Sequence, residues 1–148
     1  MNKEKISFKS IDMVRQVEFE MDEMKRGFHL ITPEIVKKAG LLPEKGILHI
    51  LIKHTSAALI INENADPDVR FDLQAFINKL IPESHSLYEH SLEGLDDMPA
   101  HIKSSILGQN LTIPISRHTL NLGTWQGIYL CEFRNHGGPR SFVLTIIE

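Results

Sequence analysis

Apolar and polar residues alternate along much of the chain, and this alternation predicts β-strands with one buried face. Two segments, 46–53 and 57–61, are almost continuously apolar and predict strands buried in a core. The remaining predicted strands are 6–11, 13–20, 27–31, 111–115, 119–122, 127–133 and 142–147. Strand patterning therefore dominates both ends of the chain.

Helical patterning interrupts the strands at three places. The first helix is short: Thr32 is the expected N-cap, Pro33 occupies the first helical position, and Gly40 ends it. The third, at 99–107, is closed by Gly108.

The second predicted helix, 66–80, has the strongest start signal. Asp66 is the expected N-cap, and Pro67 follows at the first helical position. Apolar residues at helical spacing form its predicted buried stripe: Val69, Leu73, Phe76, Ile77 and Leu80.

The order of these elements predicts the fold class. Closely spaced strands joined by polar turns indicate an antiparallel sandwich or barrel, and the helices do not alternate with strands as βαβ units would. We therefore expect an α+β protein, mainly antiparallel β. The 148 residues suit one domain, 1–148, and 42% hydrophobic residues suffice for a real core.

Charge and cysteine content narrow the function classes. The formal net charge is −3 and the basic residues are scattered, which argues against a nucleic-acid-binding protein. The single Cys131 allows no internal disulfide, and its apolar surroundings favour a buried thiol over a nucleophile. Residues 1–9 lack the apolar core of a signal peptide and no apolar run could span a membrane, so we expect a cytoplasmic protein.

A first polar cluster consists of two short segments, one between the apolar runs 46–53 and 57–61 and one directly after the second run. His54, Thr55 and Ser56 separate the two predicted core strands, and 62–66 follows the second. His54 could ligate a metal or move a proton, and Glu63 could act as a base or ligand. The alternative is a purely structural role, in which Thr55 and Ser56 end a strand and 62–66 caps the second helix.

A second cluster contains His90 and His101, separated by ten residues that include Asp96 and Asp97. Without cysteine ligands, zinc favours imidazole nitrogen and carboxylate oxygen, and the aspartates could orient an imidazole. The spacing matches no local chelating motif, so a solvated acidic loop is the alternative.

Two further groups could hold an anion and a planar ring. The start of the third helix, with Ser104 and Ser105, could bind an anion. Trp125 could cover a ring whose edge Gln126 reads, and Arg140 could hold phosphate. The alternatives are an ordinary amphipathic helix, and a packed tryptophan with Arg134 and Arg140 on the surface.

Several long blocks of the sequence resemble the YjbQ family, also called the secondary thiamine-phosphate synthase enzyme family. The resemblance extends from about Lys5 to the C-terminus. The matching blocks are 26–32, 54–59, 62–67, 88–90, 96–105 and 123–128.

This resemblance implies a jelly-roll-like β-sandwich with about three short helices, assembled as a homotrimer. It also implies a polar pocket in which His54, His90 and His101 bind a divalent metal such as zinc. The candidate catalytic residues are Glu63, Asp97, His101 and Glu132. The candidate residues for substrate or phosphate are Thr55, Asn62, Ser104, Ser105, Thr124, Trp125, Gln126 and Arg140.

Three functions stay open on this basis. The first is condensation of a hydroxymethylpyrimidine diphosphate with a thiazole phosphate, which the resemblance implies as a secondary activity. The second is metal-dependent hydrolysis of a small phosphorylated or heterocyclic substrate, with Glu63 as base. The third is a ligand-binding trimer without catalysis. The expected partner is a small phosphorylated substrate, with neither nucleic acid nor membrane involved.

Overall fold

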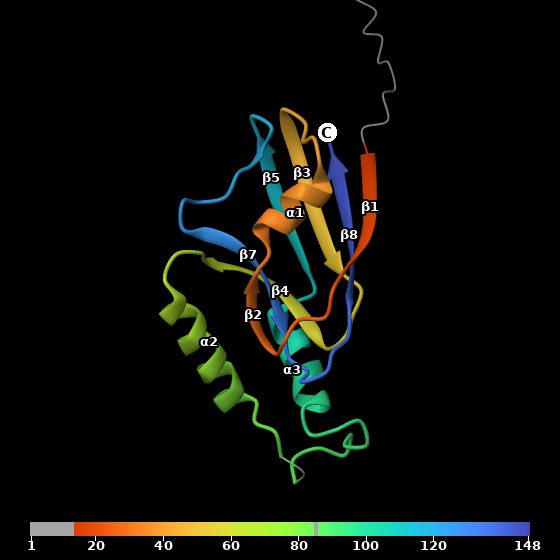
Figure 1. Ribbon diagram of the computed structural model, residues 1–148, viewed down its shortest axis with the longest axis vertical. Coiled ribbons are helices and arrows are strands. Elements are labelled where there is room, and N and C mark those ends of the chain that lie inside the picture. The colour runs from red at the N-terminus through yellow and green to blue at the C-terminus, as the bar shows by residue number, and fades with distance from the viewer. Residues whose placement is uncertain (1–13, 85) are drawn as a thin grey trace, which may run out of the picture.

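A computed structural model describes residues 14–84 and 86–148, and these form eight strands and three helices (Figure 1). The predicted strand 6–11 lies outside the described residues. The helices are α1 (Thr32–Ala39), α2 (Pro67–Leu80) and α3 (Asp97–Leu107). The strands are β1 (Val14–Met21), β2 (Gly27–Leu30), β3 (Lys45–Ile52), β4 (Ala57–Glu63), β5 (Asn110–Ser116), β6 (Thr119–Leu120), β7 (Gln126–Glu132) and β8 (Arg140–Ile147).

The strands form two sheets, and every pairing is antiparallel. One sheet has the order β1-β8-β3-β5-β6 and the other the order β2-β7-β4. Consecutive strands β3 and β4 lie in different sheets, so the short segment between them crosses from one sheet to the other. The α+β class predicted from the sequence is confirmed.

A main core fills the space between the two sheets. Alternate side chains of the five-stranded sheet, such as Leu48, Ile50 and Leu144, point inward and are fully buried. Leu59 and Ile128 meet them from the three-stranded sheet, and α1 adds apolar side chains at one side. The two facing sheets therefore form a sandwich around one core.

A second, smaller core lies on the outer face of the three-stranded sheet, beneath α2 and α3. Tyr129 and Cys131 of β7 pack there with Ile77 of α2 and Ala100 of α3. Strand β7 is thus buried on both faces, which explains its unbroken apolar run. The prediction that Cys131 is buried is confirmed, and this burial raises the pKa of its thiol.

Of the two predicted N-cap residues, Asp66 is confirmed and Thr32 is not. Asp66 caps α2, because its carboxylate accepts a hydrogen bond from the Asp68 N–H at 2.9 Å. The prediction that Thr32 caps α1 is wrong, since Thr32 is the first residue of that helix. Its hydroxyl instead accepts the Ile128 N–H at 2.8 Å and so ties α1 to β7.

The predicted apolar stripe of α2 is only partly buried. Ile77 is buried, but Phe76 and Leu80 are 62% and 59% exposed, as is Phe71 at 65%. Helix α2 therefore presents large apolar side chains to solvent, with Phe76 and Leu80 on one side and Phe71 on the other. Among the described residues, no helix has the length and apolar character needed to cross a bilayer.

Candidate functional site

The predicted site residues fall into two groups at opposite ends of the β4–β7 pair. The register joins Ala57 to Glu132 at one end and Glu63 to Gln126 at the other. Six residue steps along an antiparallel strand span about 20 Å. The histidine cluster and the Trp125 group therefore do not share one cavity within a single chain.

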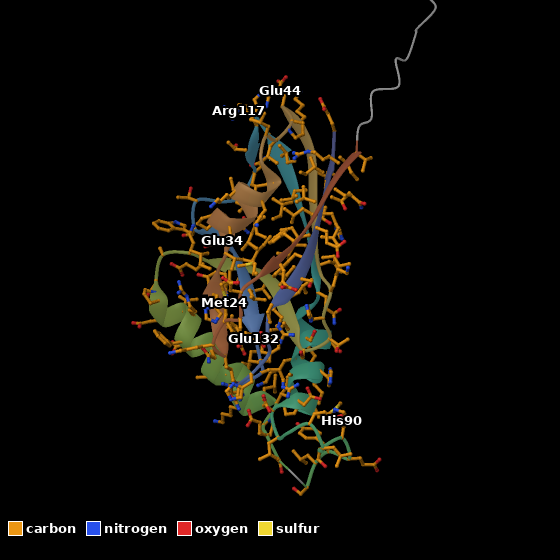
Figure 2. All side chains as sticks on the ribbon, turned by 45° about the vertical axis from the view of Figure 1, so that its right-hand side comes forward. Met24, Glu34, Glu44, His90, Arg117 and Glu132 are labelled. Carbon is orange, nitrogen blue, oxygen red and sulfur yellow. The ribbon has the colours of Figure 1, made fainter. Side chains whose placement is uncertain are left out.

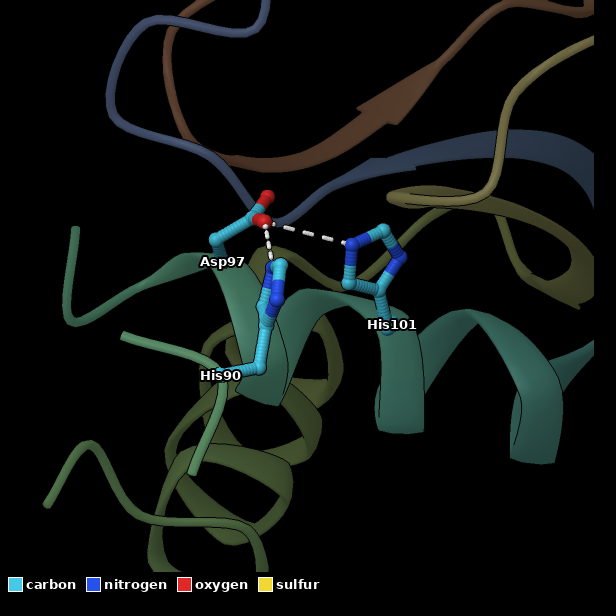
Figure 3. Close-up of side chains that lie close together, drawn as sticks. All are labelled: His90, Asp97 and His101. Atoms are coloured by element: carbon cyan, nitrogen blue, oxygen red, sulfur yellow. Dashed lines mark hydrogen bonds and ion pairs between the residues drawn. The ribbon is translucent and has the colours of Figure 1, made fainter. Parts of the chain in front are cut away.

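Two of the three predicted histidines meet at the start of α3, where both rings face Asp97 (Figure 3). His90 Nε2 lies 2.6 Å and His101 Nε2 3.2 Å from the same oxygen, Asp97 Oδ2. One ligand atom of each residue lies within 4.8 Å of the others. We call these three residues the metal-candidate cluster. Figure 2 shows His90 at one end of the long axis, far from Glu44 and Arg117.

The orientation of His101 is fixed from the backbone. Its Nδ1 lies 2.9 Å from the carbonyl oxygen of Thr55, in the segment between β3 and β4. A carbonyl can only accept, so Nδ1 carries the proton and donates it. Nε2 is the atom that faces Asp97 at 3.2 Å, and because an ionised carboxylate only accepts, this contact needs a proton on Nε2. A bound metal ion would take the place of that proton, as in metal-binding histidines held by a backbone carbonyl.

Asp97 is buried and ionised. Burial alone would raise its pKa, but the hydrogen bond from His90 and the charge of Arg134 outweigh burial and lower the pKa of Asp97. The hydrogen bond to Asp97 conversely raises the pKa of His90. Arg134 also donates from Nε to Asp96 at 3.0 Å, so one guanidinium anchors both aspartates.

Arg134 was not among the predicted site residues. The sequence analysis considered it only as a possible surface residue, because nothing in the local pattern shows that the segment after β7 returns to the start of α3. The one available signal was its position directly beyond the predicted strand that ends with Glu132 and Phe133.

Glu132 and Arg140 form a buried ion pair beside this cluster. Arg140 donates from Nε and Nη2 to the two oxygens of Glu132, each at 2.6 Å, and from Nη1 to Ser56 Oγ at 3.1 Å. The side chains are 0% and 3% exposed, so the alternative that Arg140 lies on the surface is wrong. The catalytic role of Glu132 and the phosphate-binding role of Arg140 stay predictions, and each would compete with this pair.

His54 lies near the ion pair rather than in the metal-candidate cluster. Its Nε2 accepts the Ser141 N–H at 2.8 Å, so that lone pair is committed to strand β8. Burial, followed by the charge of Arg140, lowers the pKa of His54. His54 is therefore not part of the metal-candidate cluster, and its role as a metal ligand stays a prediction.

The predicted anion site at the start of the third helix is not formed as expected. Helix α3 begins at Asp97, so Ser104 and Ser105 lie well inside it. Ser104 Oγ donates to the Ala57 carbonyl at 2.6 Å, and Ser105 Oγ to the His101 carbonyl at 2.8 Å. Both hydroxyls are therefore occupied with backbone.

The second group of predicted residues does come together, at the other end of β4. Asn62, Glu63, Trp125 and Gln126 line an open surface pocket with Ile61, and its volume is about 410 Å³. Thr124 belongs to the turn that carries Trp125. The sequence analysis had placed Asn62 and Glu63 in one cluster and Trp125 and Gln126 in another, and their roles in binding or catalysis stay predictions.

Comparison with known proteins gives one consistent family. Residues 16–148 match the family model described as UPF0047 protein YjbQ-like. The UPF0047 protein YjbQ of Salmonella typhimurium is 53% identical over 128 residues, which cover 85% of this chain and 92% of that protein. A UPF0047 protein of Methanocaldococcus jannaschii is 46% identical, with 79% and 82% covered.

Solved structures show the same fold. A conserved hypothetical protein from Thermus thermophilus aligns with a TM-score of 0.76 and 31% identity, covering 89% of this chain and 99% of that one. A protein of the YjbQ/UPF0047 family from Clostridium acetobutylicum aligns with a TM-score of 0.73 and 35% identity, covering 89% and 99%. These names state no reaction, so the chemistry has to be argued from the site.

Proposed function

This chain belongs to the YjbQ-like UPF0047 family, and on that premise we propose that it is a metal-dependent enzyme acting on a small phosphorylated substrate. The observation that carries the proposal is the convergence of His90, Asp97 and His101, from a loop and a helix, on one point. Three protein ligands with an open further position are typical of catalytic rather than structural zinc sites.

The donor set fits a divalent ion such as zinc. Ligands about 2.0–2.1 Å from a tetrahedral ion lie roughly 3.3 Å from one another. The separation of 3.2 Å between His101 Nε2 and Asp97 Oδ2 is near that value. The 2.6 Å between His90 Nε2 and Asp97 Oδ2 is a hydrogen-bond distance, so the His90 side chain, which is on an exposed loop, would have to move outward by about 0.7 Å to admit the ion. The side chains of His90 and His101 are 42% and 33% exposed, so a substrate can reach the ion's open side.

The residues of the chain have distinct roles in this proposal. His90 and His101 supply neutral imidazole nitrogens, and the Thr55 carbonyl keeps His101 in the required tautomer. Asp97 supplies a carboxylate whose orientation Arg134 holds. A bound divalent ion would neutralise developing charge on a phosphate leaving group or lower the pKa of water.

The reaction that the resemblance implies is condensation of a pyrimidine diphosphate with a thiazole phosphate. One observation favours the second candidate, hydrolysis: Glu63 and Trp125 lie about 20 Å from the histidines along β4. A ring held by Trp125 is therefore not at the metal-candidate cluster of the same chain. For the same reason, Glu63 of the same chain is too far away to act as the base for hydrolysis at the metal-candidate cluster.

An assay with one and then both substrates separates the two reactions. The pyrimidine diphosphate is incubated with the protein and zinc, alone and with the thiazole phosphate. Condensation releases pyrophosphate only when both are present, whereas hydrolysis releases phosphate or pyrophosphate from the diphosphate alone.

His101→Ala should lower either activity at least about tenfold, because loss of a metal ligand removes charge stabilisation. His49→Ala is the matched control, since His49 lies in β3 of the large sheet, where its ring is hydrogen-bonded to the Thr112 hydroxyl, and is not part of the metal-candidate cluster. Equal activity of His101→Ala and wild type would reject this site. Tight ligand binding without turnover would favour the non-catalytic alternative.

We also propose a cytoplasmic homotrimer. The exposed apolar side chains of α2, Phe71, Phe76 and Leu80, support an interface between copies, since a surface of this kind favours association. Light scattering on the purified chain should give three times the mass of 16.9 kDa. The double variant Phe71→Ser, Phe76→Ser should shift it toward the monomer, and a monomeric wild type would contradict the proposal.

A further inference from the structure

The carboxylate of Glu132, the last residue of β7, connects two arginines beside the metal-candidate cluster. Its oxygens accept hydrogen bonds from Arg140 Nε and Nη2, each at 2.6 Å. One of them, Oε1, also accepts the backbone N–H of Arg134 at 2.9 Å. Glu132 therefore holds one arginine by its side chain and the other by its backbone.

The first connection leads to His101. Arg140 donates from Nη1 to Ser56 Oγ at 3.1 Å, and Ser56 directly follows Thr55 in the segment between β3 and β4. The Thr55 carbonyl accepts the proton of His101 Nδ1 at 2.9 Å. The position of Arg140 thus helps to set the position of the carbonyl that orients this imidazole.

The second connection leads to Asp97. The Arg134 N–H is bound to Glu132, and the Arg134 guanidinium donates to Asp97 Oδ1. The same guanidinium donates to the Glu93 carbonyl at 3.0 Å, in the loop that carries His90. The other oxygen, Asp97 Oδ2, is the one that faces both imidazoles. One buried carboxylate is therefore linked to two of the three candidate ligands.

The ion pair of Glu132 and Arg140 is covered by the chain itself. A Cβ added to Gly137 would lie 2.6 Å from Arg140 Nη2 and 2.7 Å from both oxygens of Glu132, so the loop between β7 and β8 closes over the pair. Burying two charges adds little to stability, because removing both from water is costly. A fully hydrogen-bonded buried network does, however, hold its members in one arrangement.

We propose that Glu132 and Arg140 are positioning residues for metal binding at the metal-candidate cluster. They touch neither the ion nor the substrate, and act by holding the Thr55 carbonyl and the Arg134 guanidinium in place. The inference rests on the proposed function, because it requires that the cluster binds a divalent ion. Residues that orient metal ligands typically contribute about 10–100-fold to metal affinity.

The test breaks the first connection without removing a buried charge. Ser56→Ala removes the hydroxyl that Arg140 contacts, and Ser56→Thr is the conservative variant that keeps a hydroxyl there. Ser116→Ala is the matched control, because Ser116 likewise has a side-chain hydrogen bond, from Asn121, but ends β5 far from α3. Zinc affinity is measured by calorimetry, and the urea midpoint of each metal-free protein is measured alongside.

Ser56→Ala should bind zinc about tenfold more weakly than wild type, because the carbonyl that orients His101 is less firmly held. Ser56→Thr and Ser116→Ala should bind zinc as wild type does. The urea midpoints of Ser56→Ala and Ser116→Ala should be similar, so a loss of zinc affinity in Ser56→Ala alone reports positioning and not general destabilisation.

Glu132→Gln extends the test to the second connection. It should weaken zinc binding more than Ser56→Ala does, because Glu132 supports both arginines. Adding Ser56→Ala to Glu132→Gln should then have little further effect, and fully additive losses of affinity would contradict a shared network. If Glu132→Gln does not fold, the comparison of Ser56→Ala with Ser116→Ala decides alone.

Wild-type zinc affinity in Ser56→Ala would overturn this inference and leave the metal site standing, as would equal losses in Ser56→Ala and Ser116→Ala. Absence of zinc binding in the wild-type protein would reject the proposed function, and this inference with it. The wild-type measurement therefore tells the two failures apart.

Discussion

At the scale of single residues, buried charge near the candidate site is the most informative feature. Glu132 and Arg140 are both buried and satisfy one another through two hydrogen bonds. The sequence shows neither the pairing nor the burial, because the two residues end and begin different strands joined by a loop. Lys103 is likewise buried, at 1% exposure, and its ammonium donates to Asn78 Oδ1 at 2.7 Å.

Breaking the Glu132–Arg140 pair should destabilise the fold strongly. Glu132→Gln leaves the Arg140 charge buried without its counter-ion, and we expect a loss of about 3–5 kcal/mol in the free energy of unfolding. Urea denaturation measures it. The exposed pair of Lys53 and Glu18 is the control, and Glu18→Gln should cost less than about 1 kcal/mol. Similar losses for both variants would mean that Arg140 is hydrated.

Because of Lys103, the free energy of unfolding should increase as the pH is raised from about 8 to 10.5. Burial lowers the pKa of Lys103 from 10.5 to about 8. Between these values the unfolded chain holds the proton that the folded chain has released, so raising the pH favours the folded state.

Lys103→Met should remove this rise in the unfolding free energy, measured across the interval between the folded pKa of about 8 and the unfolded pKa of 10.5. Lys79→Met, at an exposed position of α2, should keep it. A rise that persists in Lys103→Met would assign the effect to another group.

At the scale of elements, local signals in the sequence predicted most strands and helices within one or two residues. The Asp66-Pro67 start of α2 was predictable because capping depends on neighbouring residues alone. The role of Thr32 was not, because its hydroxyl bonds to Ile128, a residue 96 positions away. Exposure of the α2 stripe was missed for the same reason, since periodicity shows which side is apolar but not what covers it.

The cap of α2 gives a prediction at this scale. Asp66→Ala removes the acceptor for the Asp68 N–H and should lower the free energy of unfolding by about 1 kcal/mol. Asp72→Ala, at an exposed position inside the same helix, should change it by less than about 0.5 kcal/mol. Thermal unfolding of the two variants compares them directly, and equal effects would argue against a capping role.

At the scale of the whole molecule, the predicted site residues lie in two groups at opposite ends of the β4–β7 strand pair of one chain. Spacing could not predict this division. His90 and His101 are separated by ten residues and meet only because a loop folds back on α3, while His54 is held by β8. Asn62 and Glu63 lie beside Trp125 and Gln126 because β4 pairs with β7, a pairing that the two separate segments of sequence do not show.

The central claim is that His90, Asp97 and His101 bind one divalent ion. The most direct measurement is the zinc bound per chain after equilibrium dialysis of wild type, Asp97→Asn and His49→Ala. One zinc per chain is expected for wild type and His49→Ala, and at least about tenfold weaker binding for Asp97→Asn. Zinc bound equally by all three proteins, or by none of them, would contradict the account.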